Sequence, residues 1–137
     1  MTAPAAYLHL PGTARHALNF YADVFGGNVQ MHSYADFGRT DGPVDAIAHG
    51  YLTDGPVSLF AADVFGDEPP LRCEGIMLSL LGMADSTSLR HWFARLSDGG
   101  RVVDELQARA WGASDGRVID RHGVYWLIGF ESDGGGG

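Results

Sequence analysis

Histidine is the residue type in this chain with the widest choice of chemistry. The chain has six histidines, and three of them, His9, His32 and His49, fall on predicted strands in its first half. Alternation along a strand places His9 on the same side as Tyr7, and His49 on the same side as Ile47 and Tyr51. Because imidazole exchanges protons near neutral pH, His49 is our candidate for an acid or base. The sequence leaves open whether His9, His32 and His49 converge on an atypical metal site.

Other side chains suited to binding lie at strand ends and in loops. Asp63 and Glu131 end the last strand of each half of the chain, and aromatic side chains supply apolar contact area. Trp111 precedes a glycine in a loop, where an aromatic platform can contact a ligand. The predicted ligand-binding residues are therefore His9, Tyr7, Tyr51, Trp111, Asp63 and Glu131.

Composition excludes several mechanisms. The 137 residues contain no lysine, which rules out a Schiff base on the chain and a phosphate loop of the lysine-containing type. A net charge of −8 argues against binding to nucleic acid. The single cysteine, Cys73, cannot form an internal disulfide. Neither a signal peptide nor an apolar run of about 18 residues is found, so we expect a cytoplasmic protein that does not bind membranes.

The elements that carry these residues occur twice. A helix is predicted from Thr13, as its cap, to Gly26-Gly27, and a second from Asp85-Ser86 to Gly99-Gly100. A strand precedes each helix (7–10 and 76–81), and a hairpin follows it (46–52 with 57–62, and 117–120 with 124–130). Both turn glycines, Gly55 and Gly123, are expected at positive φ. The pattern predicts an α+β fold of two βαβββ modules.

We place module one at 5–64, a linker at 65–72 and module two at 73–131. Together they form a single domain over 1–131, followed by a flexible, glycine-rich tail at 132–137. One helix cannot cover both faces of a four-stranded sheet, so the modules must pair. The sequence does not tell whether they pair within the chain or across a dimer.

Particular runs of residues resemble a known family. These are Tyr7-Leu8-His9-Leu10-Pro11-Gly12, Val24-Phe25-Gly26-Gly27, Trp111-Gly112-Ala113 and Asp120-Arg121-His122-Gly123-Val124 with Trp126. They are similar to the PhnB-like branch of the vicinal oxygen chelate superfamily, which includes glyoxalase, bleomycin-resistance and extradiol dioxygenase proteins. The resemblance implies a U-shaped mixed sheet around a cleft, often in a homodimer. It also implies a histidine at the position of His49.

The same resemblance gives positions for metal ligands, and this chain has apolar residues there. The positions fall near Ala5, Leu59, Met77 or Leu78, and Leu127, the last standing where metal-dependent relatives have glutamate. None of these side chains can ligate a divalent ion. We therefore expect no metal and no cofactor.

The leading functional hypothesis is a small-molecule-binding protein that sequesters a small organic ligand or gives resistance to it. The alternative is a glyoxalase-like lyase or isomerase, or a hydrolase, that uses His49 as an acid or base, with or without an atypical metal. The sequence does not identify the ligand.

Overall fold

The computed structural model describes residues 4–131, and the chain divides into two compact units, Met1–Leu71 and Arg72–Gly137. Their boundary falls within the linker predicted at 65–72. The glycine-rich tail predicted at 132–137 lies outside the described residues.

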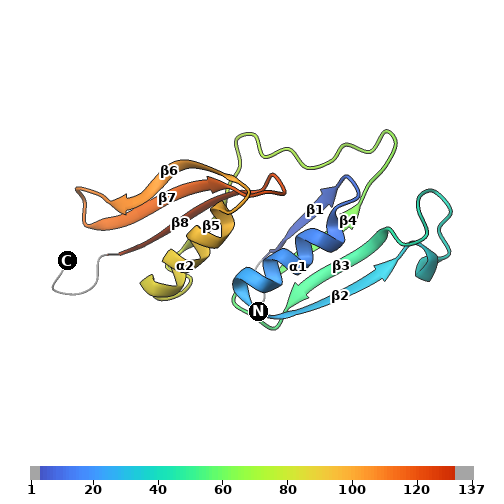
Figure 1. Cartoon of the computed structure of the whole chain (residues 1–137), viewed down its shortest axis with the longest axis horizontal. Coiled ribbons are helices and arrows are strands. Elements are labelled where there is room, and N and C mark those ends of the chain that lie inside the picture. Colours follow the sequence, from blue (N-terminus) through green and yellow to red (C-terminus); the bar gives the residue numbers. More distant parts are fainter. Residues whose placement is uncertain (1–3, 132–137) are drawn as a thin grey trace. The chain divides into compact units, whose positions relative to one another are not determined.

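The first unit is a mixed four-stranded sheet with one long helix. In chain order it contains β1 (Ala6–Leu10), α1 (Ala14–Phe25), β2 (Asn28–Ser33), the short 3₁₀ helix η1 (Ala35–Phe37), β3 (Ile47–Thr53) and β4 (Leu59–Asp63). The strand order is β1-β4-β3-β2, with β1 parallel to β4 and the other pairs antiparallel. The helix α1 lies along one face of this sheet (Figure 1).

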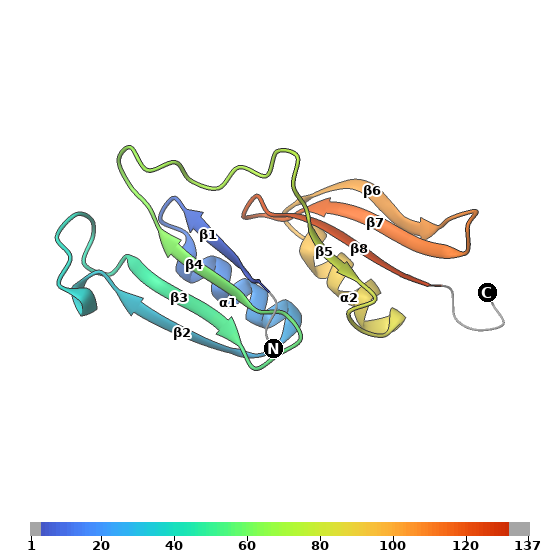
Figure 2. The same ribbon diagram turned by 180° about the vertical axis from the view of Figure 1, so that it is seen from behind.

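The second unit repeats this plan. It contains β5 (Leu78–Leu81), α2 (Ser86–Ser97), β6 (Arg101–Ala108), β7 (Ala113–Ile119) and β8 (Tyr125–Glu131), in the strand order β5-β8-β7-β6. Here β5 runs parallel to β8, and α2 packs on one face of the sheet, as the reverse view also shows (Figure 2). The predicted α+β fold of two βαβββ modules is confirmed. No helix within residues 4–131 has the length and hydropathy needed to cross a membrane.

Both helices bury an apolar stripe whose residues recur at the three- and four-residue spacing of a helix. In α1 the buried side chains are Ala14, Ala17, Leu18, Tyr21, Val24 and Phe25, and in α2 they are Leu89, Trp92, Phe93 and Leu96. The second helix starts where the sequence predicts, and Asp85 caps it, since its carboxylate accepts the Ser88 N–H at 2.7 Å. The predicted Thr13 cap is wrong: the Thr13 side chain makes no cap bond, and Ala14 N–H donates to Asp63 Oδ1 at 2.8 Å.

The repeated glycine pair has a steric cause. A Cβ on Gly27 would lie 2.6 Å from the Thr53 carbonyl oxygen, and one on Gly100 would meet the Ile119 carbonyl oxygen. Each helix is therefore followed by a chain segment pressed against its own hairpin, where only glycine fits. Gly123 has the predicted positive φ, but the prediction for Gly55 is wrong: Asp54 takes the positive φ, and Gly55 is needed because its Cβ would lie 2.9 Å from the Gly26 carbonyl oxygen.

Candidate functional site

Four ring-bearing side chains gather on the face of the first sheet opposite α1. The register aligns Tyr7 on β1 with Phe60 on β4, and Phe60 with Tyr51 on β3. His49 lies two residues before Tyr51 and therefore on the same face. We call these four residues the aromatic face. Its rings contact one another at centroid distances of 5.6–6.2 Å, with Phe60 nearly parallel to Tyr7.

One hydrogen bond within the aromatic face joins two groups that can exchange protons. The Tyr7 hydroxyl lies 2.8 Å from His49 Nδ1. Burial raises the pKa of the Tyr7 hydroxyl, which keeps its proton available for donation. When Tyr7 donates, Nδ1 accepts and the imidazole proton is on Nε2. The arrangement then fixes both the tautomer and the orientation of the His49 ring, the usual way of preparing a histidine for a polar task.

A hollow of about 310 Å³ adjoins the aromatic face at the carboxyl ends of β1 and β4. Its lining includes Tyr7 and His9 from β1, and Tyr34, Phe65 and Glu68 from the connecting segments. The Tyr34 hydroxyl donates to the Asp63 carbonyl oxygen at 2.8 Å, which holds the Tyr34 ring in place. A volume of this size is at the lower end of what small-molecule pockets offer.

Asp63 also lines the hollow, but its carboxylate is already bonded to the backbone. The side chain is buried, and its two oxygens accept Ala14 N–H and Ile47 N–H, each at 2.8 Å. This ties the start of α1 and the start of β3 to the end of β4. A ligand that bound these oxygens would have to break the buried hydrogen bonds from Ala14 N–H and Ile47 N–H. The geometry therefore indicates a structural role for Asp63, which fixes the backbone around the hollow.

The histidines considered for an atypical metal site each have a different neighbour. His9 Nδ1 lies 3.5 Å from Glu68 Oε1, and the His32 ring stacks on Phe37 at 5.8 Å. His49 is held by Tyr7, as described above. Within residues 4–131, no group of three or more His, Cys, Asp or Glu side chains is arranged to hold a metal ion.

The remaining predicted site residues lie in the second unit. Trp111 is 72% exposed in the turn between β6 and β7, and Glu131 ends β8 opposite Ala113. Both therefore lie at the same end of the second sheet. Within the first unit, Tyr7, His9, His49 and Tyr51 lie on one face of the sheet, whereas the Asp63 carboxylate points to the α1 side. Trp111 and Glu131 lie in the second unit.

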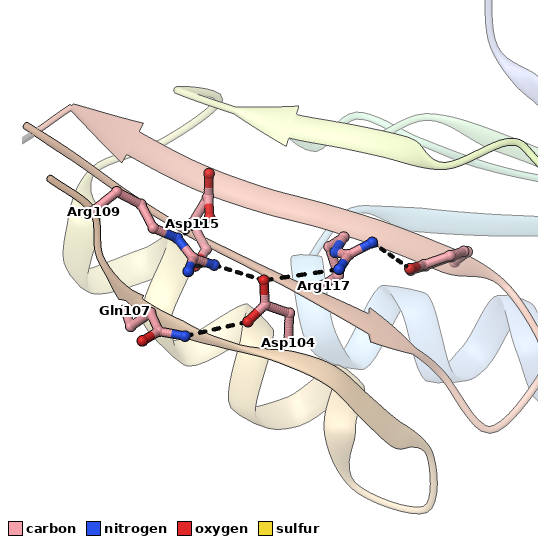
Figure 3. A network of polar contacts seen from close by, with 6 residues as sticks. Asp104, Gln107, Arg109, Asp115 and Arg117 are labelled. Carbon is pink, nitrogen blue, oxygen red and sulfur yellow. Dashed lines mark hydrogen bonds and ion pairs between the residues drawn. The ribbon is translucent and has the colours of Figure 1, made fainter. Parts of the chain in front are cut away.

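The second sheet carries charges on its face opposite α2 (Figure 3). Arg109 donates to Asp115 Oδ1 and to Asp104 Oδ2, both at 2.7 Å, and these carboxylates raise the pKa of its guanidinium. Arg117 donates to the Tyr125 hydroxyl at 3.2 Å and lies 3.9 Å from Asp104. The charges pair with one another and link β6 to β7.

Sequence reasoning missed several residues of these faces. Phe60 was one of them. The pairing of Phe60 with Tyr51 in the hairpin would have placed it on the sheet face away from α1. The mapping of a ligand position to Leu59 is wrong for the same reason, because Leu59 is buried on the α1 side. The register makes Phe60 the counterpart of Leu127, which pairs with Arg117 as Phe60 pairs with Tyr51. Glu68 and Arg39, which reach the hollow from loops, gave no periodic signal.

Two βαβββ modules of this kind define the glyoxalase/bleomycin-resistance fold, and solved structures agree. The chain is similar to protein PA1353 from Pseudomonas aeruginosa (30% identity, TM-score 0.80), over 97% of this chain and 100% of that one. It is also similar in fold to the PhnB protein from Bacillus cereus (17% identity, TM-score 0.77), over 94% of this chain and 99% of that one.

A third similar structure is the fosfomycin resistance protein FosX from Listeria monocytogenes (10% identity, TM-score 0.60), over 96% of this chain and 91% of that one. That structure is a complex with Mn(II) and dihydroxypropylphosphonic acid. No protein-family model and no curated protein matches the sequence. The chain belongs to the same family as protein PA1353, and it shares the fold of the PhnB protein and of FosX.

Proposed function

We propose that this protein binds a small organic molecule against the aromatic face of its first unit, and that it sequesters this ligand or gives resistance to it. The observation that carries the proposal is the Tyr7–His49 hydrogen bond inside a cluster of rings, directly beside a hollow of about 310 Å³. Apolar ring surface with a few fixed polar atoms is the usual composition of a small-molecule site. Binding of an organophosphonate by FosX, a protein of the same fold, also supports the proposal.

Absence of the family's metal ligands favours binding over metal chemistry. The positions that correspond to each other in the two sheets hold Phe60 and Leu127, and neither side chain can ligate an ion. A ligand would have to be recognised by ring stacking and by the Tyr7–His49 pair. Trp111 and Glu131 remain predicted ligand contacts from the second unit. A homodimer in the cytoplasm remains a prediction as well.

Native mass spectrometry and a thermal-shift screen of small aromatic compounds test the proposal. We expect a bound compound whose dissociation constant rises about tenfold or more in Phe60→Leu, which keeps apolar volume but removes the ring. His16→Ala, an exposed change on α1, should bind like the wild type. A protein that retains full affinity after Phe60→Leu and Tyr51→Ala does not use the aromatic face.

The second candidate is an enzyme in which His49 acts as an acid or base, and the Tyr7–His49 bond favours it. Tyr7 would set the tautomer that presents Nε2 to a substrate. His49→Ala would then abolish turnover of a compound that the variant still binds, whereas a binding protein shows no turnover to lose. Tyr7→Phe separates the roles further, since it keeps His49 but releases its ring, and should lower kcat more than it raises KM.

A further inference from the structure

The hollow beside the aromatic face has an excess of negative charge. Its lining contains three carboxylates, Asp41, Asp63 and Glu68, and one guanidinium, Arg39. The formal charge is therefore −2 when His9 is neutral and −1 when His9 is protonated. A carboxylate or phosphonate group on a ligand would be repelled by this excess when His9 is neutral.

The three carboxylates differ in how well they are already paired. Arg39 donates to both oxygens of Asp41, at 2.9 and 2.6 Å, and this pair neutralises itself. Asp63 is bonded to two backbone N–H groups, as described above. Among residues 4–131, the charged neighbour of Glu68 is His9, whose Nδ1 lies 3.5 Å from Glu68 Oε1, and the Glu68 side chain is 56% exposed. Glu68 is thus the carboxylate of the hollow that can accept a new cationic partner.

Aromatic rings in the same lining also suit a cation. The Arg39 guanidinium lies 3.8 Å above the centroid of the Tyr34 ring, so one cation already stacks on a ring in this hollow. Phe65 stands edge-on to Tyr34 at 5.9 Å, and Tyr7 borders the hollow from β1. Phe65 and Tyr7 are 38% and 46% exposed, which leaves ring surface for a ligand.

We propose that the hollow binds the cationic group of an organic ligand, a protonated amine or a quaternary ammonium, with Glu68 as its counter-ion and the Tyr7 and Phe65 rings against its carbon atoms. This inference rests on the proposed function and names the chemical class of the ligand. The apolar part of the same ligand would lie on the aromatic face, which Tyr7 shares with the hollow.

Three probes with a phenyl ring on a short alkyl chain test the charge preference. They are 2-phenylethylamine, 2-phenylethanol and 3-phenylpropionate, which are cationic, neutral and anionic at pH 7. Titration of the full-length chain, followed by NMR or calorimetry, should give the order amine, alcohol, carboxylate. We expect the amine to bind about fivefold more tightly than the alcohol, and this ratio should fall as salt rises.

Glu68→Gln keeps the shape of the side chain and removes its charge. It should bring the affinity for the amine down to that for the alcohol and leave the alcohol unchanged. Asp67→Asn is the matched control, since Asp67 is exposed on the same segment outside the lining, and it should preserve the amine preference. A comparable loss in both variants would overturn the role of Glu68 and reduce the effect to net charge.

The outcomes separate this inference from the proposed function. If the amine and the alcohol bind equally, and both bind worse in Phe60→Leu, the cation site is wrong and the aromatic face remains the binding surface. If the carboxylate binds best, the cation site is also wrong. If no probe binds at millimolar concentration, the cation site is overturned, while the screen with Phe60→Leu still decides the proposed function.

Discussion

The two βαβββ units have the same backbone plan and opposite chemistry on the sheet face away from the helix. In the first unit, the row across three strands reads Tyr7, Phe60 and Tyr51. At the corresponding positions of the second unit, the row reads Ser79, Leu127 and Arg117. The position of His49 corresponds to that of Asp115. The two units therefore share their strand pairing and their steric glycines, and they differ in the side chains on the sheet face away from the helix.

The difference also extends to how the polar groups are satisfied. In the second unit, the Arg109 guanidinium donates to the carboxylates of Asp104 and Asp115. These ion pairs are internal to the second unit and link its strands. In the first unit, the aromatic face consists of ring side chains, and a hydrogen bond joins the Tyr7 hydroxyl to His49 Nδ1. A face that satisfies its own charges is a poor ligand site, and a face of rings with one fixed donor is a better one. This difference favours the proposed binding of a ligand at the first unit over binding at the second.

The largest loss in the free energy of unfolding is expected when either of two buried aspartates is removed. Each unit has one, and its carboxylate accepts backbone N–H groups. Asp120 accepts His122 N–H, Val124 N–H and Trp126 Nε1–H, whereas Asp63 accepts two backbone N–H groups. Removing a buried acceptor leaves its donors unsatisfied. Urea unfolding should show a loss of about 4 kcal/mol in Asp120→Ala and about 3 kcal/mol in Asp63→Ala.

The exposed Asp67→Ala is the control for these changes and should lie close to the wild type. Amide hydrogen exchange adds the comparison between units, because each variant should speed exchange mainly in its own unit. If both variants lay within about 1 kcal/mol of the control, the two carboxylates would not hold the backbone.

Much of the fold could be predicted from the sequence, because the residues that repeat between the two units are set by local steric constraints. The helix stripes, the double glycines and the hairpin glycine Gly123 all impose local constraints that a pattern can display. The start of α1 was not readable, because the group that accepts its first N–H is Asp63, 49 residues further along the chain. Thr13 is a residue type that caps helices and stands at the cap position. The distant Asp63 carboxylate nevertheless accepts the N–H at the start of α1 in place of the Thr13 side chain.

The candidate site was predicted only in part, for a related reason. Strand alternation put Tyr7, His9, His49 and Tyr51 on one face, which is how the structure has them. It also put Ile47 there, and this is wrong, because the register shifts between His49 and Ile47 and the Ile47 side chain is buried. Alternation alone did not single out Phe60, because a shift of one residue in register exchanges Leu59 for Phe60 at the face, and the hairpin register is needed to decide between them. Nor could it find Arg39 and Glu68, which reach the hollow from segments without a regular period.

The next effect compares glycines at corresponding positions beneath the two helices. A Cβ on Gly50 would lie 2.5 Å from Leu18 Cδ1, the far end of a side chain that can rotate. A Cβ on Gly116 would lie 2.7 Å from the backbone of Leu106, which cannot yield without moving β6. We expect Gly116→Ala to cost about 3 kcal/mol and Gly50→Ala about 1 kcal/mol in urea unfolding. Equal losses would mean that the backbone of Leu106 moves aside for the added methyl group as easily as the Leu18 side chain does.

A smaller effect tests whether the charges of the second unit stabilise it. Arg109→Met removes both bonds to Asp104 and Asp115 but keeps much of the side-chain volume. Its urea midpoint should fall clearly below that of the wild type, and high salt should narrow the gap. Arg39→Met breaks the exposed pair with Asp41 in the first unit and should shift the midpoint far less. The reverse order would contradict our distinction between a self-satisfied face and an open one.

The smallest effect concerns proton binding by Tyr7. Because burial raises the pKa of Tyr7 in the folded state, the folded chain holds this proton at a pH where the unfolded chain has lost it. The corresponding contribution to stability is complete below the unfolded value of about 10 and is lost as pH rises through the folded pKa. Tyr7→Phe should flatten this alkaline decline and remove one tyrosinate absorbance step near 295 nm, at a pH above the usual tyrosine range. Tyr125→Phe removes one tyrosine from the charged face instead, and if it had the same effect, the hydroxyl bonded to His49 would not be the one that burial protects.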